Sequence, residues 1–195
     1  MFRENGSMQG QHDTERLALA LHHNDLSGIH MTGDCIDRVF KRGQLVDVRE
    51  GHNLVVNSFL SLVMCLLKQQ NGYSGIQYWA VGSGAAAWDS ELPTPDVNAT
   101  RLTKEIGRVP IAAGEILFLD REFNETSTPT NILQIKHLFT EDDCNGPWRE
   151  FGIFGGNATL SANSGIMVNK RHHAVLTKTE EMTVERVLRF TLSLT

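Results

Sequence analysis

The chain has 195 residues and a formal net charge of −5, from 23 Asp and Glu residues against 18 Lys and Arg residues. This length is sufficient for a single domain with its own hydrophobic core, alone or with an appended arm. The acidic balance argues against nucleic acid as a partner, because nucleic-acid binding requires a concentrated basic surface. No stretch approaches the roughly 20 consecutive apolar residues of a membrane span, so a membrane is not an expected partner either.

The first 33 residues differ in composition from the rest and predict an N-terminal arm. Residues 1–11 are polar, which is typical of a loose chain end. Residues 14–23 have the pattern of a short amphipathic helix with Leu17 and Leu21 on one face. Because an isolated helix of this length is marginal in water, we expect it to dock on this domain or on a neighbouring subunit. Leu17 and Leu21 are therefore candidate interface residues.

Residues 34–195 have the pattern of a mainly-β domain. A hairpin is predicted first, because two strand-like segments flank a turn that contains Gly43. In the last strand-like segment, residues 182–194, apolar and polar side chains alternate, as in a strand with one face on a core. Arg186 interrupts its apolar face and needs a partner or an edge position, which makes it a candidate interface residue. Strands are expected over residues 35–40, 45–49, 76–81, 105–111, 115–120, 132–139, 148–154, 166–177 and 182–194.

These short strands are separated by Gly, Pro, Asn and Thr and do not alternate with helices, so they predict an antiparallel, jelly-roll-like β-sandwich. One α-helix is expected within the domain, over about residues 57–69. Asn57 or Ser58 can cap this helix, and Asn-Gly at residues 71–72 is a stop signal. Residues 59–67 are almost wholly apolar, and a helix that is apolar all round is expected to be buried.

A glycine motif at residues 82–87 matches the G-x-G-x-x-G/A fingerprint of dinucleotide-binding proteins. That fingerprint requires a following helix, whose N-terminus holds the pyrophosphate. Pro93 and Pro95 exclude a helix interior from the continuation, so we expect a surface loop and no cofactor. Trp88 lies between small residues and these prolines. The sequence leaves open whether it is core or an exposed anchor, and Trp88, Pro93 and Pro95 are candidate contacts with a partner subunit.

No pattern in the chain predicts a catalytic or metal site. His172 and His173 lie in a strand-like segment and should point to opposite faces, so they cannot chelate one ion together. The histidines at residues 22–23 would diverge by about 100° on a helix. The neighbouring acids at residues 142–143 and 180–181 lie in polar turns, where carboxylates are usually solvated. The G-x-S-x-G elbow of acyl-transfer enzymes does not occur in the sequence.

The three cysteines, Cys35, Cys65 and Cys144, are odd in number and widely spaced, which fits neither a disulfide framework nor a zinc site. Cys65 lies within the expected helix, and this position predicts an inert thiol in the core. Acidic neighbours should raise the pKa of Cys144. Residues 1–5 show no apolar segment of a secretory signal. We therefore expect synthesis in a reducing cytoplasm.

Five segments follow one another along the chain: H-N-L-V-V-N-S at 52–58, I-Q-Y-W-A-V-G-S-G at 76–84, L-T-K-E-I-G-R at 102–108, W-R-E-F-G-I-F-G-G at 148–156 and M-T-V-E-R-V-L-R-F-T-L at 182–192. In this order they resemble a group of tailed-bacteriophage virion proteins, the β-sandwich domains of tail fibres, baseplates and head decoration. The similarity covers about residues 45–195, and in that family these residues are architectural and none is catalytic.

The resemblance implies a structural protein of the tail, baseplate or tail fibre, located in the virion after synthesis in the bacterial host cytoplasm. Its expected partners are copies of itself and other virion proteins, with a host surface glycan as a further partner. Capsid decoration is the alternative within the family. A carbohydrate-binding sandwich and a small hydrolase are alternatives of other classes. An exposed aromatic platform, for which Trp88 and Tyr73 are the candidates, would favour the carbohydrate-binding sandwich. A cleft with convergent acid and base groups would favour the hydrolase.

Overall fold

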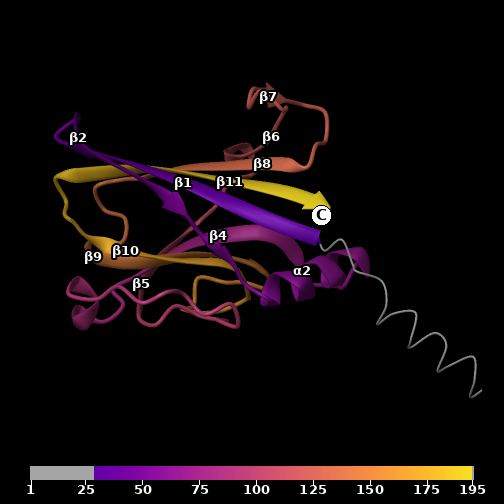
Figure 1. Cartoon of the computed structure of the whole chain (residues 1–195), viewed down its shortest axis with the longest axis horizontal. Coiled ribbons are helices and arrows are strands. Elements are labelled where there is room, and N and C mark those ends of the chain that lie inside the picture. Colours follow the sequence, from indigo (N-terminus) through magenta and orange to yellow (C-terminus); the bar gives the residue numbers. More distant parts are fainter. Residues whose placement is uncertain (1–28, 195) are drawn as a thin grey trace, which may run out of the picture. The chain divides into compact units, whose positions relative to one another are not determined.

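Two antiparallel β-sheets pack face to face in the computed structural model, which describes residues 29–194 (Figure 1). The predicted mainly-β sandwich is therefore confirmed. One sheet has the strand order β2-β1-β11-β8-β6-β7 and the other the order β3-β10-β9-β4-β5. The first sheet contains β1 (Ile29–Lys41), β2 (Gln44–His52), β6 (Ile116–Leu119), β7 (Glu125–Thr126), β8 (Ile132–Phe139) and β11 (Met182–Leu194). The second contains β3 (Leu54–Val55), β4 (Ser74–Gly82), β5 (Glu105–Pro110), β9 (Gly146–Gly156) and β10 (Ile166–Lys178).

The observed β1 corrects the expected boundary of the N-terminal arm. This strand begins at Ile29, so residues 29–33 belong to the sheet and not to an arm that extends to residue 33. The strand could not be seen in the sequence there, because Thr32 and Gly33 interrupt the apolar pattern. The predicted helix over residues 14–23, with Leu17 and Leu21, lies outside the described residues.

The β1–β2 hairpin forms where the sequence predicts it. Lys41 pairs with Gln44, and both residues between them have a positive φ, 51° at Arg42 and 78° at Gly43. This backbone twist matches that of the two strands, and glycine adopts it at little cost. Arg42 is held in the same conformation by Glu181, whose carbonyl accepts its backbone N–H at 3.0 Å and whose carboxylate pairs with its guanidinium.

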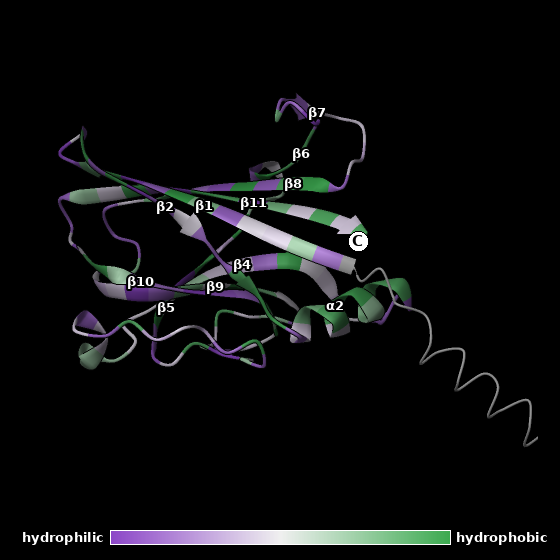
Figure 2. Ribbon diagram, in the orientation of Figure 1, coloured by the Kyte–Doolittle hydropathy of each residue, from purple (hydrophilic) through white to green (hydrophobic). Residues whose placement is uncertain are grey.

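The core lies between the two sheets and is rich in aromatic side chains. On β11 the predicted alternation is confirmed for Val184, Leu188 and Phe190, which are buried, while Glu185 and Arg189 are only partly covered. At the end of the strand the prediction is wrong, because Leu192 and Leu194 are exposed. Figure 2 shows the same alternation of hydrophobic and hydrophilic residues along this strand. The largest fully buried apolar side chains are Trp79, Trp148, Phe139, Phe151, Phe154, Phe190, Leu62, Leu102, Leu119 and Ile135.

The predicted helix exists as α2 (Ser58–Leu67), but the expectation that it is buried is wrong. Leu62 is its one buried residue, whereas Leu60, Met64 and Leu67 are 55%, 64% and 72% exposed. Among the described elements, the helix packs mainly on β10, β4 and β9, at one end of the sandwich (Figure 1). One stripe of a helix can touch such a surface, so the remaining apolar residues stay in solvent. Cys65 is accordingly half-buried and not a core thiol.

Hydrogen bonds at the start of α2 also differ from the expected cap. Asn57 occupies the N-cap position without a side-chain bond to the helix. The Ser58 hydroxyl instead donates to the Met167 carbonyl at 2.7 Å, which ties the helix to β10. Within residues 29–194, no helix is long and apolar enough to span a membrane.

Candidate functional site

Arg186 is the centre of a buried charge cluster between the sheets. Its side chain has no exposed surface, and its Nε and Nη2 donate to the two carboxylate oxygens of Asp37 at 2.6 and 2.8 Å. The guanidinium lies 4.0 Å from the ring centroid of Phe151 and 5.4 Å from that of Trp148. The candidate interface position of Arg186 is thereby corrected. The partner that its sequence context required is Asp37 on the neighbouring strand β1.

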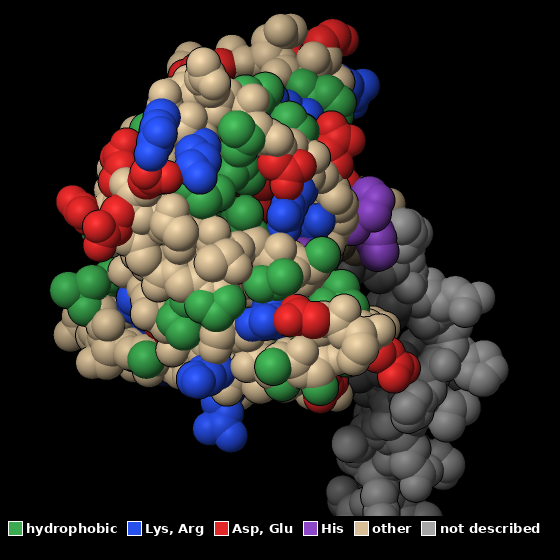
Figure 3. All heavy atoms as spheres, turned by 90° about the vertical axis from the view of Figure 1, so that its left-hand side faces the viewer, with side chains coloured by type: hydrophobic (Ala, Val, Ile, Leu, Met, Phe, Trp, Pro, Cys, Tyr) green, Lys and Arg blue, Asp and Glu red, His purple; other side chains and the backbone are tan. Residues whose placement is uncertain are grey.

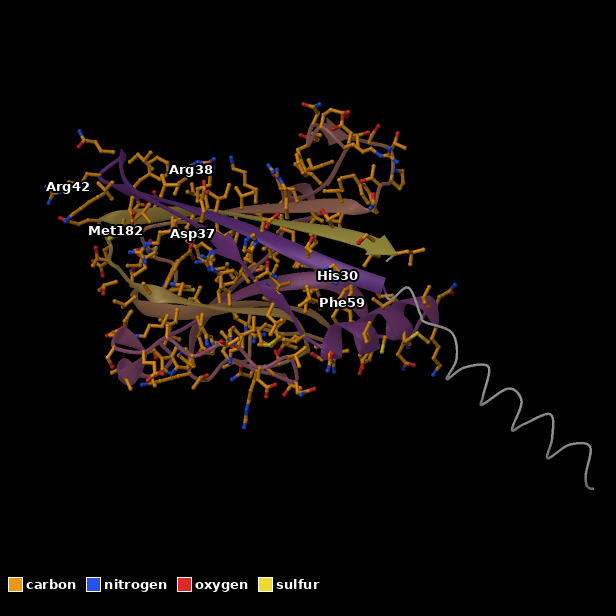
Figure 4. All side chains as sticks on the ribbon, viewed as in Figure 1. His30, Asp37, Arg38, Arg42, Phe59 and Met182 are labelled. Carbon is orange, nitrogen blue, oxygen red and sulfur yellow. The ribbon has the colours of Figure 1, made fainter. Side chains whose placement is uncertain are left out.

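Asp37 keeps its negative charge inside the core. Burial by itself would raise the pKa of this carboxyl, but the charge and the hydrogen bonds of Arg186 outweigh it and hold the pKa below its usual value. Figure 4 shows Asp37 pointing from β1 into the space between the sheets, while the neighbouring Arg38 points away from it. Adjacent residues of a strand face opposite sides, so the Asp37 carboxylate lies in the hydrophobic layer and the Arg38 guanidinium faces solvent.

A cavity of about 480 Å³ opens beside this cluster, between β1 and β2 of one sheet and β10 of the other. We call it the inter-sheet cleft. Its lining consists of charged and histidine residues with two apolar ones, namely Asp37, Arg49, Glu50, Leu92, Arg171, His172, His173 and Ala174. Volumes of about 300–1,000 Å³ are typical of small-molecule sites.

Arg171 is the least satisfied charge in the cleft. Its side chain comes from β10, the residue is only 9% exposed, and its Nη2 donates to the Glu50 carbonyl at 2.9 Å. Its Nη1 is buried without a hydrogen-bond partner among residues 29–194, and the guanidinium forms no salt bridge there. Gly51 allows this placement, since a Cβ at that position would collide with the guanidinium.

His173 faces the same side of β10 as Arg171. Its Nδ1 lies 2.8 Å from the Ala174 carbonyl oxygen, which can only accept, so Nδ1 carries the hydrogen and Nε2 is a bare acceptor. This Nε2 is buried and has no partner in the described part of the chain. Burial, assisted by the positive charge of Arg186, lowers the pKa of His173 from 6.5 to about 4, so the ring is neutral at pH 7.

His172 points to the opposite side of β10, as the strand periodicity predicts. Its Nδ1 donates to the Pro93 carbonyl at 2.8 Å, and its ring lies against Trp88 with the centroids 4.2 Å apart. The two histidines therefore do not converge. No group of three potential metal ligands occurs within the residues that the structure describes.

The loop that contains Trp88 is fastened to the sandwich. Trp88 is half-buried between His172 and Gly84, where a Cβ would collide with the indole ring. Asp89 forms a two-pronged ion pair with Arg149, at 2.7 and 2.6 Å. Pro93 is exposed and Pro95 half-buried. The contact of Trp88, Pro93 and Pro95 with a partner subunit stays a prediction.

The segment after Gly84 forms a four-residue 3₁₀ turn, η1 (Ala86–Asp89), in place of the α-helix that a dinucleotide site requires. A second cavity of about 270 Å³ lies beside this turn and shares Leu92 and Ala174 with the inter-sheet cleft. Its other lining residues are Trp88, Asp89, Ser90 and Val175. The two cavities thus adjoin each other at Leu92 and Ala174.

Two further buried ion pairs have architectural roles. Arg108 and Glu105 form a two-pronged pair within β5, at 2.6 and 2.9 Å. Glu150 is fully buried, 3.1 Å from Lys170, and accepts the backbone N–H groups of Thr103 and Lys104. Both pairs bind loops to the five-stranded sheet.

Cys35, which is buried, and Cys144, which is half-buried, are poor nucleophiles. Burial raises the pKa of the Cys35 thiol to about 12, with a contribution from Asp37. The pKa of Cys144 is raised to about 11, chiefly by burial and then by the charge of Asp143. The expected direction for Cys144 is therefore confirmed, although acidic neighbours are the lesser cause. A thiol with such a pKa stays protonated at neutral pH.

Sequence reasoning missed the convergence of Asp37, Arg171 and His173. One signal was present, because residues 171 and 173 share a face of the predicted strand and are polar where a core face should be apolar. Asp37 lies in a different sheet, and no local pattern reports that contact.

The strand β2 presents a separate surface, at the edge of the six-stranded sheet. On it Leu45, Val46 and Val48 are 53%, 56% and 48% exposed. Figure 3 shows hydrophobic side chains among charged ones on the end of the molecule that carries the β1–β2 turn.

Comparisons of the chain with protein-family models, with curated proteins and with solved structures found no match.

Proposed function

We propose that the chain is a structural component of a tailed-phage particle, in the tail, baseplate or tail fibre, and that it assembles with copies of itself and with other virion proteins. The observation that carries the assembly role is the apolar edge of β2, which pairs with no further strand among residues 29–194 on its outer side. The phage setting comes from the sequence resemblance described above. Capsid decoration remains the alternative placement in the particle.

The edge of β2 is suited to strand pairing. It is nine residues long, whereas the other edge strands, β3, β5 and β7, have two, six and two residues. An edge strand offers unpaired backbone N–H and C=O groups, and monomeric proteins usually protect such edges with Lys, Pro or short length. β2 has neither Lys nor Pro and exposes Leu45, Val46 and Val48.

The charges of β2 also match those of a second, antiparallel copy. If two β2 strands pair about Val48, Asp47 of each chain lies opposite Arg49 of the other. Within one chain these two side chains already form an ion pair at 2.7 Å. In this register Val48 also lies opposite Val48 of the other copy, so the strand provides one apolar pair as well as charge complementarity, while Val46 lies opposite Glu50. Such an isologous contact produces a closed pair, which larger symmetric assemblies commonly contain.

The first test changes the edge and measures association. Val48→Lys places a charge in the apolar strip, and we expect it to weaken self-association of the full chain by tenfold or more, about 1.4 kcal/mol. Leu160→Lys is the matched control, because Leu160 is an exposed apolar residue outside the strands. Native mass spectrometry and sedimentation equilibrium measure the oligomers. A wild-type chain that is still monomeric at about 100 μM would contradict the assembly role, because its self-association would then be weaker than that of most specific assemblies.

The second test addresses the particle. Antibodies against the purified chain are applied to phage particles from a lysate of the host that carries the gene. We expect labelling of tails or baseplates in negative-stain micrographs, at a fixed position. Labelling over the capsid surface supports capsid decoration instead. A chain that remains in the soluble fraction, while intact particles carry no label, would contradict the virion role.

A further inference from the structure

We propose that the inter-sheet cleft binds a small organic carboxylate that carries a hydroxyl group near the carboxylate, either as a free hydroxy acid or as an acidic sugar. The proposal rests on buried polar atoms of Arg171 and His173 that have no partner among the described residues, and on a cavity of suitable size that these two residues line. It is independent of the assembly role of β2, because the cleft residues Arg171, His173 and Asp37 are buried in the single chain.

The carboxylate is inferred from the charge balance of the cluster. Asp37 offers one negative charge to two buried guanidinium groups, those of Arg186 and Arg171, and it is fully engaged by Arg186. His173 is neutral and adds no charge. A buried guanidinium without a counter-ion is strongly unfavourable, and one carboxylate in the cavity would balance it.

The other charged groups of the cleft do not supply that balance. Arg49 pairs with Asp47 at 2.7 Å and donates to the carbonyls of Ala174 and Val175. Glu50 accepts from Arg171 through its backbone carbonyl, and its exposed carboxylate forms no salt bridge with any described residue. Solvent screens such a carboxylate at the mouth of the cleft. The unmatched positive charge therefore lies inside, at Arg171.

The charge count favours a carboxylate over a phosphate. Nη1 of Arg171, which carries two N–H groups, has no hydrogen-bond partner among the described residues, while Nη2 donates to the Glu50 carbonyl. One missing positive-charge partner matches a monoanion. A phosphate dianion would bring a second negative charge next to Asp37.

The hydroxyl group is inferred from His173. Its buried Nε2 can only accept a hydrogen bond, because Nδ1 already donates to the Ala174 carbonyl. A carboxylate cannot donate at neutral pH, so the ligand needs a second group that can. A hydroxyl next to the carboxylate satisfies both atoms with one small molecule.

The adjoining cavity gives room for a longer ligand. Its lining includes Leu92, the indole of Trp88 and the polar side chains of Asp89 and Ser90. This combination suits the remainder of a sugar, whose ring has apolar faces and hydroxyl edges. A free hydroxy acid would fill only the inner cavity.

Isothermal titration calorimetry on the full chain tests the proposal with four probes: D-glucuronate, L-lactate, D-glucose and acetate. Glucose lacks the carboxylate and acetate lacks the hydroxyl. We expect glucuronate or lactate to bind with a Kd below about 1 mM, and the other two at least tenfold more weakly. Tight binding of glucuronate alone identifies an acidic sugar, and equal binding of lactate identifies a free hydroxy acid. If all four probes bind equally, or if none binds at about 10 mM, the proposal is wrong.

Variants locate the binding in the cleft. Arg171→Gln should weaken the best probe at least tenfold, and Arg38→Gln, on the outer face of β1, should leave it unchanged. Leu92→Trp is the second cleft variant, because Leu92 is an exposed lining residue whose enlargement blocks the cavity without removing a buried charge. Circular dichroism checks the fold of each variant. Unchanged affinity in a folded Arg171→Gln or Leu92→Trp protein would overturn the assignment to the cleft.

Discussion

At the scale of single residues, the core combines aromatic packing with one ion pair that is fully removed from solvent. Arg186 and Asp37 are far apart in sequence and meet between four aromatic rings, those of Trp79, Phe139, Trp148 and Phe151. Replacing a buried ion pair by apolar residues of similar volume is often neutral, whereas removing one partner is costly. We therefore expect the pair to contribute more to the choice of neighbouring strands than to stability.

Removal of Arg186 alone should be strongly destabilising. Arg186→Met leaves the Asp37 carboxylate buried without a partner, and we expect a loss of about 3–5 kcal/mol in the free energy of unfolding. Asp37→Leu combined with Arg186→Met should recover most of that loss, because no unpaired charge remains. Urea unfolding of the three proteins measures this. A double variant as unstable as Arg186→Met would show that the pair itself, and not the uncompensated charge, matters.

His173 should make stability depend on pH. Its pKa is about 4 when folded and 6.5 when free, so the unfolded chain takes up a proton first as the pH falls. The stabilising contribution is present above pH 6.5 and is lost between pH 6.5 and about 4, by roughly 3 kcal/mol. His173→Gln should flatten this part of the curve, while exposed His52→Gln should not. An unchanged slope in His173→Gln would contradict the burial of this ring.

Leu62 and Leu66 provide a paired test of how α2 packs. Leu62 is buried and Leu66 is 41% exposed, although the sequence predicts burial of both. Leu62→Ala should cost about 2–5 kcal/mol of unfolding free energy, and Leu66→Ala below about 1 kcal/mol. Urea denaturation distinguishes them. Equal losses would mean that α2 is enclosed on both sides.

At the scale of elements, strand periodicity was readable and helix burial was not. Alternation along residues 182–194 reports one core face directly, because a strand has a fixed period of two. The apolar run in α2 reports only that a helix is hydrophobic. Its burial depends on how many elements lie around it, and α2 has the sandwich on one side only. Arg186 was likewise recognised as needing a partner, but Asp37 could not be identified without the pairing of distant strands.

The β1–β2 turn is an element whose geometry depends on one glycine. Gly43 has a φ of 78°, so Gly43→Ala forces a left-handed conformation on alanine and should cost about 1–2 kcal/mol. Gly114→Ala is the control, because its added Cβ has open space and its φ is not positive. Thermal unfolding measures both variants. If Gly43→Ala is as stable as Gly114→Ala, the turn does not have this geometry.

At the scale of the whole molecule, a sandwich with one long open edge is suited to assembly, and the inter-sheet cleft adds a small-molecule site on the other side of the same strand. The sandwich was predictable from many short strands with turn residues between them. Neither the β2 edge nor the cleft was predictable. The edge arises from the strand order, which places β2 outermost among the described strands of its sheet, and the cleft arises where β10 faces β1 and β2. The segment of residues 82–87, by contrast, was predictable, because Pro93 and Pro95 exclude a following helix and indicate a loop.

The most direct test of the assembly claim is a disulfide across the proposed contact. In a full chain with Val48→Cys, antiparallel pairing about residue 48 brings the two Cα atoms within the range that a disulfide spans. Leu160→Cys controls for random oxidation and for the native cysteines. After mild oxidation, non-reducing electrophoresis should show a covalent dimer for Val48→Cys and none for Leu160→Cys. A Val48→Cys chain that stays monomeric, or that dimerises no more than Leu160→Cys, would contradict pairing of β2.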